Sequence, residues 1–329
     1  MTSSSPSARI VPGHRPESIR DAVERLRAGR LVGLPTETVY GLAASTFDAD
    51  AIAEVYRAKS RPTDNPLIAH VSGLDVARSL TSAWNDAAER IAQTCWPGPV
   101  TIVLPRAATV PAEAAGGHDS IAIRMPAHPV ALRVLEAFGR PVSAPSANPS
   151  GAVSPTEARH VLADFTDLDL LILDGGPSRV GLESTVVDVR DEDRPTVLRP
   201  GGVGRTRLSE ILGRSVATHE SVTQSESPGS AARHYAPDVT TRICDLDDAG
   251  GDGVAVITIG QEGDRPLGRG EPLFRVDLPS DPEAVASLLY CSLHAADFSG
   301  AERIDLVPPP NTVAWEAIHD RIGRATAQG

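Results

Sequence analysis

Lysine occurs once among the 31 basic residues of the chain, at Lys59, and Arg61 and Asn65 follow closely. A lysine ammonium is a compact point charge whose pKa shifts when it is buried, whereas an arginine guanidinium is a rigid fork that binds oxyanions bidentately. Both cations beside Asn65 indicate a site for a polyanion. The alternative is a solvated helix end that carries a lysine by chance.

Hydroxyl side chains gather directly after the apolar run 31–34, which we predict to be a short buried strand. Thr36 and Thr38 lie in the turn that follows it. Their hydroxyl groups can bind the amino or carboxylate group of a small ligand, or they can only cap the backbone, as threonine does in many turns.

Two predicted strands carry chargeable side chains. His70 lies near the end of the strand at 67–71 and can orient a carboxylate or an amine, although a lone histidine in a strand is commonly a structural group. Ser120 and Arg124 are four residues apart on one strand and therefore share a face. Arg124 needs an anion if it points inward, and an anionic ligand and a core carboxylate are both consistent.

Polar side chains also lie in loops at the ends of other predicted elements. The loop at 143–151 is rich in hydroxyl and amide groups and leads to a helix that we expect to open at Ser154, where backbone N–H groups attract anions. Ser184 precedes a predicted strand, and Arg199 follows one, where α/β folds place their ligands. For the loop at 143–151, an ordinary surface loop rich in proline and serine is the alternative.

Hydrophobic periodicity predicts an α/β protein with two structured parts. Helices are expected at 19–26, 48–58, 84–95, 130–138, 208–212, 282–296 and 312–325, and strands at 31–34, 67–71, 100–104, 121–124, 141–144, 170–173, 185–189, 196–198, 253–259 and 303–307. The segment 218–230 is polar and aperiodic, which indicates a linker. The pattern restarts beyond Pro237 as a small unit with parallel strand pairing.

The composition excludes several classes of protein. A net charge of −12 argues against broad non-specific binding of nucleic acid. The cysteines Cys95, Cys244 and Cys291 are far apart, so neither a zinc ribbon nor a disulfide framework is indicated. The polar N-terminus does not resemble a signal peptide, and no apolar run approaches membrane-spanning length, so we expect a cytoplasmic protein without membrane association.

The common nucleotide-binding motifs are absent from the sequence. Lys59 follows no glycine, which excludes the P-loop, and the glycines at 201–204 lack the third glycine of the dinucleotide fingerprint. Neither His-Glu-x-x-His nor Gly-x-Ser-x-Gly occurs. A nucleotide, if bound, is held by a less common set of residues.

Longer motifs indicate a family. They are Pro-Thr-Glu-Thr-Val-Tyr-Gly-Leu at 35–42, Lys-x-Arg at 59–61, Asn-Pro-Leu-Ile-x-His at 65–70, Trp-Pro-Gly-Pro-x-Thr at 96–101, Ile-Arg-x-Pro at 123–126, Ser-Ala-Asn-x-Ser-Gly at 146–151, Glu-Ser-Thr at 183–185, Arg-Pro-Gly at 199–201 and Arg-His-Tyr-Ala-Pro at 233–237. From residue 17 onward the chain resembles threonylcarbamoyl-AMP synthases of the longer type. One departure is Ser230, where the family's linker usually carries methionine.

The resemblance implies a nucleotidyltransferase that converts L-threonine, bicarbonate and ATP into threonylcarbamoyl-AMP and pyrophosphate, with Mg²⁺ on the triphosphate and no structural metal. The implied threonine-binding residues are Thr38, His70, Arg124, Ala144 through its backbone, and Ser184. The implied ATP-binding residues are Arg61, Asn65, Ser120, Ser146, Asn148, Ser154, Arg199 and Tyr235. Lys59 and Arg61 are the implied catalytic cations that neutralise charge on the phosphates.

The implied architecture is a YrdC-like twisted mixed sheet with helices around a concave site, plus a smaller Rossmann-like α/β domain. We expect a flexible tail at 1–16, a catalytic domain at 17–215, a linker or lid at 216–237 and a C-terminal domain at 238–329. The product would supply separate proteins that modify the tRNA adenosine next to the anticodon, with tRNA contact by this chain weak or indirect.

Two rival functions are weighed against this one. An RNA-binding or ribosome-associated module without catalysis would need a basic surface, which the acidic total disfavours. A carbamoyltransferase of the hydrogenase-maturation kind carries a related domain, but it also carries cysteine-rich zinc modules that three scattered cysteines exclude here.

Overall fold

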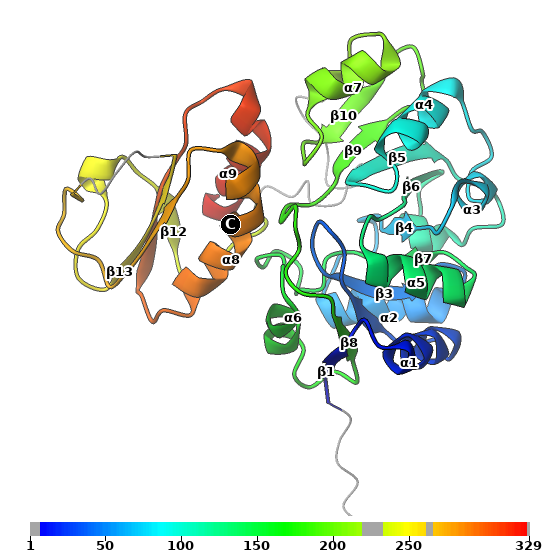
Figure 1. The fold of residues 1–329 in the computed structure, drawn as a ribbon, viewed down its shortest axis with the longest axis horizontal. Helices are drawn as coiled ribbons and strands as arrows, with labels where there is room; N and C mark the ends of the chain where they lie inside the picture. Colours follow the sequence, from blue (N-terminus) through cyan, green and yellow to red (C-terminus); the bar gives the residue numbers. More distant parts are fainter. Residues whose placement is uncertain (1–6, 219–232, 261–265, 328–329) are drawn as a thin grey trace, which may run out of the picture. The chain divides into compact units, whose positions relative to one another are not determined.

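The computed structural model describes residues 7–218, 233–260 and 266–327, which form two compact units (Figure 1). Unit 1 comprises Met1–Ser150, Pro155–Arg179 and Glu183–Ser230, and unit 2 comprises Gly151–Ser154, Val180–Leu182 and Ala231–Gly329. Two short segments inside the expected catalytic domain therefore belong to unit 2. Most of the expected linker, at 219–232, lies outside the described residues.

The described strands of unit 1 form one mixed sheet in the order β1-β8-β2-β3-β7-β4-β6-β5-β9-β10-β11. The strands are β1 (Arg9–Pro12), β2 (Val32–Leu34), β3 (Gly41–Ser45), β4 (Ile68–His70), β5 (Val100–Pro105), β6 (Ser120–Arg124), β7 (Val142–Ser143), β8 (Leu171–Asp174), β9 (Thr185–Asp188), β10 (Thr196–Arg199) and β11 (Ala217–Thr218). The sheet contains both parallel pairs, such as β4–β6, and antiparallel pairs, such as β5–β6, which confirms the expected mixed sheet.

The helices of unit 1 cover both faces of this sheet (Figure 1). They are α1 (Pro16–Arg27), α2 (Ala49–Lys59), α3 (Leu74–Ser79), α4 (Asp86–Cys95), α5 (Pro129–Phe138), α6 (Ala158–Asp164) and α7 (Arg205–Leu212), with a 3₁₀ turn η1 (Ala112–Ala115). Alternation along β3 separates the two layers of core. Ala43 packs with α1 and α5, whereas Leu42 and Ala44 pack with α2 and α4.

Local capping at both ends of α2 makes Lys59 the last residue of this helix. The Asp48 side chain accepts a hydrogen bond from the Ala51 N–H at 3.0 Å and so begins the helix. Ser60 adopts a left-handed conformation with φ of 50°, which ends the helix directly after Lys59. The expected helix at 48–58 is thereby confirmed, and Lys59 is its last residue.

Some expectations for unit 1 were wrong. Residues 9–16 are not a tail, because β1 pairs in parallel with β8 and Pro16 opens α1. The helix expected to open at Ser154 begins instead at Ala158, after Glu157. The short helix α3 was not predicted.

Unit 2 contains a parallel sheet in the order β12-β15-β13-β14, which confirms the expected small α/β unit. Its elements are β12 (Thr241–Ile243), η2 (Leu246–Asp248), β13 (Val254–Ile259), β14 (Phe274–Leu278), α8 (Pro282–Asp297), β15 (Arg303–Val307), η3 (Val313–Trp315) and α9 (Glu316–Thr326). The edge strands β12 and β14 were not predicted. Among the described residues, none of the helices is both long and apolar enough to cross a membrane.

Candidate active site

The turn between β2 and β3 in unit 1 holds a chain of buried hydroxyl groups. Thr36 Oγ1 donates to the Val39 carbonyl at 2.6 Å and lies 2.8 Å from Thr38 Oγ1. Thr36 has given its proton to Val39, so Thr38 donates to Thr36 and its own oxygen is left to accept. It accepts from Arg124 Nη1 at 2.8 Å. The predicted residues Thr38 and Arg124 are therefore in direct contact.

Arg124 is held by two segments of unit 1, the turn that contains Glu37 and Thr38 and the loop at Gly98. Besides its bond to Thr38, Nε donates to the Gly98 carbonyl at 3.3 Å, and Nη2 lies 2.6 Å from Glu37 Oε1. A core carboxylate was one of the two partners consistent with an inward-pointing Arg124. The structure shows that Glu37 is this carboxylate, and the sequence did not identify it. Burial by itself raises the pKa of Glu37, but the charge and hydrogen bonding of Arg124 outweigh burial and lower it below its ordinary value.

His70 lies beside this arginine, because β4 and β6 pair in parallel with His70 opposite Arg124. Its Nδ1 is 3.0 Å from the Ile68 carbonyl, which orients the ring. Burial, and after it the positive charge of Arg124, lowers the pKa of His70 to about 3. The imidazole is therefore neutral at physiological pH and adds no charge to the site.

Ser184 lies directly before β9 and contacts residues of the neighbouring strands β5 and β10. Its Oγ lies 2.7 Å from Thr101 Oγ1, and Arg199 donates to the Ser184 carbonyl from Nη2 at 2.9 Å and to Oγ at 3.2 Å. Both Ser184 and Arg199 are buried. The structure thus brings together a residue predicted for threonine and a residue predicted for ATP.

Lys59 is buried at the end of α2, and its ammonium contacts the loop after β7. Nζ donates to the Ser146 carbonyl at 2.6 Å, to the Asn148 carbonyl, and to Asn148 Oδ1 at 3.5 Å. The Ser150 N–H in turn donates to the Lys59 carbonyl at 2.8 Å. Burial and then the nearby Arg61 charge lower the pKa of Lys59 well below its ordinary value, and the negative charge of Asp164 opposes them.

Arg61 folds back over the segment that follows it. Its Nε donates to the Asn65 carbonyl at 3.1 Å, and Nη2 donates to Asn65 Oδ1 and to the Pro66 carbonyl at 2.9 Å. Arg61 also lines a largely apolar pocket of about 630 Å³ between α2 and η1, together with Tyr56 and Gly116. The predicted residue Ser120 begins β6 and is half-buried.

Three predicted residues have contacts that the sequence did not indicate. The Ala144 N–H donates to the Ile68 carbonyl at 3.0 Å, so this donor is used within the sheet. Ser154 and Tyr235 belong to unit 2. The Ser154 carbonyl lies 3.3 Å from His294 Nε2, and the buried Tyr235 ring packs on Tyr290 with centroids 5.7 Å apart.

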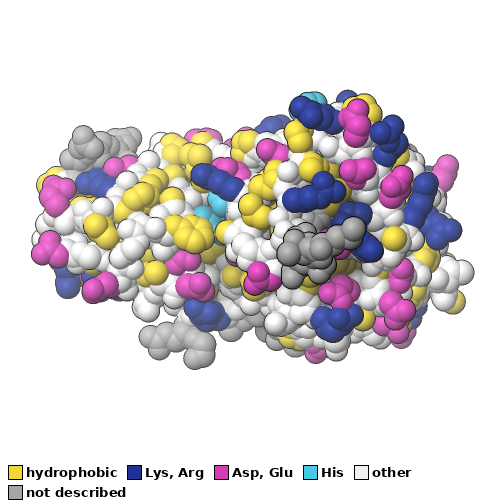
Figure 2. All heavy atoms as spheres, turned by 90° about the horizontal axis from the view of Figure 1, so that it is seen from below, with side chains coloured by type: hydrophobic (Ala, Val, Ile, Leu, Met, Phe, Trp, Pro, Cys, Tyr) yellow, Lys and Arg dark blue, Asp and Glu magenta, His cyan; other side chains and the backbone are white. Residues whose placement is uncertain are grey.

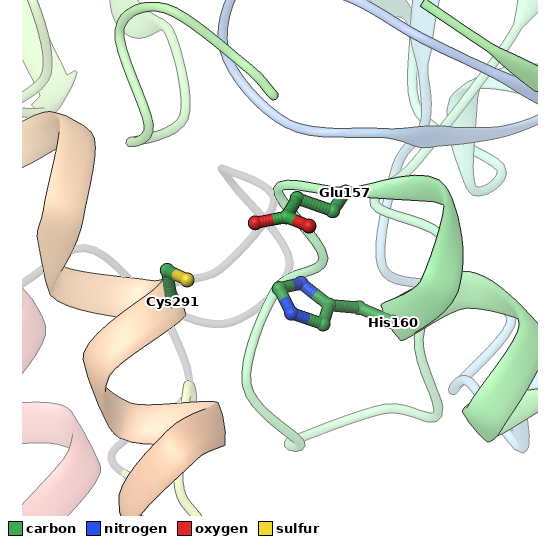
Figure 3. Close-up of side chains that lie close together, drawn as sticks. All are labelled: Glu157, His160 and Cys291. Carbon is green, nitrogen blue, oxygen red and sulfur yellow. The ribbon is translucent and has the colours of Figure 1, made fainter. Parts of the chain in front are cut away.

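Glu157 and His160 lie at the start of α6, with the imidazole close to the carboxylate (Figure 3). The Thr156 N–H donates to His160 Nδ1 at 3.3 Å. Unit 1 offers these two groups as potential metal ligands, whereas a structural zinc ion takes four.

Two protein-family models match this chain, in agreement with the motifs in its sequence. The family model for Sua5, YciO and YrdC, described as telomere recombination, matches residues 24–201, and the model described as threonylcarbamoyl-AMP synthase, C-terminal domain, matches residues 203–327.

Two relatives and one solved structure show the extent of the similarity. Threonylcarbamoyl-AMP synthase of Pyrococcus abyssi is 45% identical over 67% of this chain and 65% of its own length, and that of Bacillus subtilis is 40% identical over 69% and 66%. The chain thus spans just under two thirds of these relatives. The crystal structure of P. abyssi Sua5 complexed with L-threonine matches with a TM-score of 0.84 and 33% identity, over 97% of each chain.

Proposed function

Because the chain belongs to the Sua5/YciO/YrdC family, we propose that it synthesises threonylcarbamoyl-AMP from L-threonine, bicarbonate and ATP and releases pyrophosphate. The observation that carries this proposal is the placement, in unit 1, of Arg124 against Thr38 and of Lys59 and Arg61 against the 146–150 and 62–66 segments. The first pair suits an amino acid, and the second pair suits a triphosphate.

Threonine would bind on the side of the site formed by Thr38, His70, Arg124 and Ser184. The Arg124 guanidinium would receive the carboxylate, since arginine binds carboxylates through paired hydrogen bonds. The relative of known structure was solved with L-threonine, which supports this choice of amino acid. The backbone of Ala144 can contribute its carbonyl, because its N–H is already bonded.

ATP would bind along Lys59, Arg61, Asn65, Ser120, Ser146, Asn148 and Arg199, and it would enter with Mg²⁺ as part of the substrate. The described hydrogen bonds of Lys59 and Arg61 end on carbonyl and amide oxygens, which are neutral. A bound triphosphate would favour the charged forms of both side chains, which would then stabilise the phosphates.

The reaction would proceed in two steps. The threonine amine attacks the carbon of bicarbonate and loses water to give a carbamate. A carbamate oxygen then attacks the α-phosphorus, and the bond to the β-phosphate oxygen breaks to release pyrophosphate. Both steps gain from proximity and charge stabilisation, so a covalent nucleophile is not required.

We also propose that the segment 216–237 acts as a lid, with Tyr235 and Ser154 completing the ATP site. Its first described residues include β11 of unit 1, and its last ones are fixed within unit 2, where the Ala236 N–H donates to the Gly151 carbonyl at 2.9 Å and the His234 N–H to the Arg324 carbonyl at 3.2 Å. Exclusion of water would protect the carbamate and the mixed anhydride. ATP and threonine together should slow proteolysis of this segment in the full chain, and equal cleavage with and without them would contradict the lid.

The product would pass, in the cytoplasm, to separate proteins that modify the tRNA adenosine next to the anticodon. Direct contact with tRNA would be weak or indirect, because the chain has a net charge of −12. The face drawn in Figure 2 also shows basic and acidic side chains interspersed.

The experiment that tests this function is pyrophosphate release from MgATP. Release should require both threonine and bicarbonate, and mass spectrometry should detect threonylcarbamoyl-AMP. Release that does not depend on threonine, together with RNA binding, would instead support the RNA-binding module.

A further inference from the structure

Glu37 is a buried acid that the proposed reaction does not use. It lies in the turn between β2 and β3, and its side chain is 3% exposed. Its Oε1 is 2.6 Å from Arg124 Nη2, and the arginine side chain is 4% exposed. A buried carboxylate costs free energy when it leaves water, so its retention in a substrate site calls for a reason beyond stability.

The contacts of Arg124 indicate what Glu37 does to its geometry. A guanidinium is planar and presents its donors in a fixed fork. Glu37 forms an ion pair with the Nη2 end, and the Gly98 carbonyl accepts a hydrogen bond from Nε at 3.3 Å. With Nη2 and Nε held by these contacts, the Nη1 end is turned toward the Thr38 hydroxyl, to which it donates at 2.8 Å.

Glu37 also sets the charge of this part of the site. The positive charge of Arg124 lies against the negative charge of Glu37, whose pKa is below its ordinary value. His70 is neutral at physiological pH because its pKa is about 3. His128, whose pKa is lowered by burial, is the further histidine whose titration Glu37 influences. Because the charges of Arg124 and Glu37 cancel and His70 is neutral, these three residues together carry a net charge of about zero.

A charge-balanced pocket discriminates between carboxylic acids. A zwitterion has no net charge, and it can place its carboxylate near Arg124 and its ammonium on the side of Glu37. A simple carboxylate of the same shape brings one uncompensated negative charge close to Glu37, which is repulsive in a buried site.

We propose that Glu37 is a positioning and specificity residue that turns the Nη1 end of Arg124 toward the ligand and makes the pocket select a zwitterionic amino acid over a simple carboxylate. This inference rests on the proposed function, because it takes threonine as the ligand. It assigns to Glu37 no contact with the reacting atoms.

The test compares L-threonine with 3-hydroxybutyrate, which is threonine without its amino group. The readout is the ratio of the inhibition constant of 3-hydroxybutyrate to the KM for threonine. In Glu37→Gln this ratio should fall by about tenfold or more, because the unbalanced Arg124 attracts the simple anion. The KM for ATP should stay within about twofold. The exposed Glu136→Gln is the matched control and should leave the ratio unchanged.

An unchanged ratio in a folded, active Glu37→Gln variant would overturn the inference. If that variant does not fold, Glu37→Asp keeps the charge but draws the carboxylate back from Nη2. It should raise the KM for threonine several-fold while keeping the ratio, and an unchanged KM would overturn the positioning role. A wild-type protein that makes no threonylcarbamoyl-AMP would refute the proposed function itself, which separates the two failures.

Discussion

The two halves of the candidate site balance their cations differently. In the threonine half, Arg124 lies 2.6 Å from a buried carboxylate, Glu37, and next to a neutral histidine. In the nucleotide half, the described hydrogen bonds of Lys59, Arg61 and Arg199 end on carbonyl, amide or hydroxyl oxygens, which carry no net charge. Each arrangement matches the charge of the proposed substrate. Threonine is neutral overall, whereas a triphosphate is a polyanion.

This difference shows how the charges within unit 1 can suit two unlike proposed substrates. A carboxylate orients a cation but cancels much of its electrostatic field. Carbonyl groups also orient a cation, but they leave its net charge uncompensated. Ser184, assigned to the threonine half, lies where the halves meet, since its backbone carbonyl accepts from Arg199 of the nucleotide half.

The largest effect is expected from Lys59→Met, which removes the only lysine from the nucleotide half. Pyrophosphate release should fall by roughly 10²–10³-fold, because charge on the phosphates loses a preorganised donor. Loss of its bonds to Ser146 and Asn148 should also cost about 1–3 kcal/mol of stability. Lys59→Arg should not restore the rate, since the larger planar fork does not fit the place of an ammonium. A folded Lys59→Met variant with near wild-type turnover would remove Lys59 from the mechanism.

A second prediction concerns stability in the threonine half. Arg124→Leu should destabilise the protein by about 3–5 kcal/mol, because it leaves Glu37 buried without its counter-ion. The double variant Glu37→Leu/Arg124→Leu should lose less than the sum of the two single variants. Urea unfolding of the four proteins measures this coupling, and additive losses would show that the pair does not interact.

A third prediction concerns pH and His70. Its folded-state pKa is lowered to about 3, so between that value and about 6.5 the unfolded chain binds a proton there that the folded protein does not. The contribution of His70 to stability is therefore present above pH 6.5 and is lost as pH falls, by about 1.4 kcal/mol per pH unit.

The measurement for this third prediction is the unfolding free energy at several pH values between 6.5 and 5, where Glu37 stays ionised. His70→Asn should reduce the slope by about one proton. The same slope in the wild type and the variant would mean that His70 is protonated in the folded protein.

The smallest effect is expected where the halves meet. Thr101→Val removes the 2.7 Å contact with Ser184 Oγ, and a neutral hydrogen bond of this kind contributes about 1 kcal/mol. The KM values for threonine and ATP should both rise by a factor of about two to five, because Ser184, assigned to threonine, also accepts a hydrogen bond from Arg199 of the nucleotide half. Thr101→Ser keeps the hydroxyl and should behave as wild type. A change in only one KM would contradict the assignment of Ser184 to the boundary.

The sequence predicted what depends on local pattern. Apolar periodicity placed α1, α2, α4, α5 and α8, and the positions of Thr38 and Arg124 relative to their strands follow from turn chemistry and alternation. These features depend on neighbours in the chain.

Pairings between distant residues could not be predicted in the same way. The pattern around Glu37 does not show that its partner is Arg124, and β1 could not be recognised because its parallel partner β8 lies far along the chain. Likewise, the sequence placed Lys59 among phosphate-binding groups but could not show that its ammonium also holds the 146–150 loop. Such contacts are set by the topology of the sheet and not by local propensity.

The contrast between the two halves is tested most directly by equilibrium titration of Arg61→Gln and Arg124→Gln, each with threonine and with ATP. We expect Arg124→Gln to weaken threonine binding by about 100-fold and to leave ATP affinity within about threefold, with the reverse pattern for Arg61→Gln. The contrary result is an equal loss of both affinities in both variants, which would mean that the site is one undivided cluster.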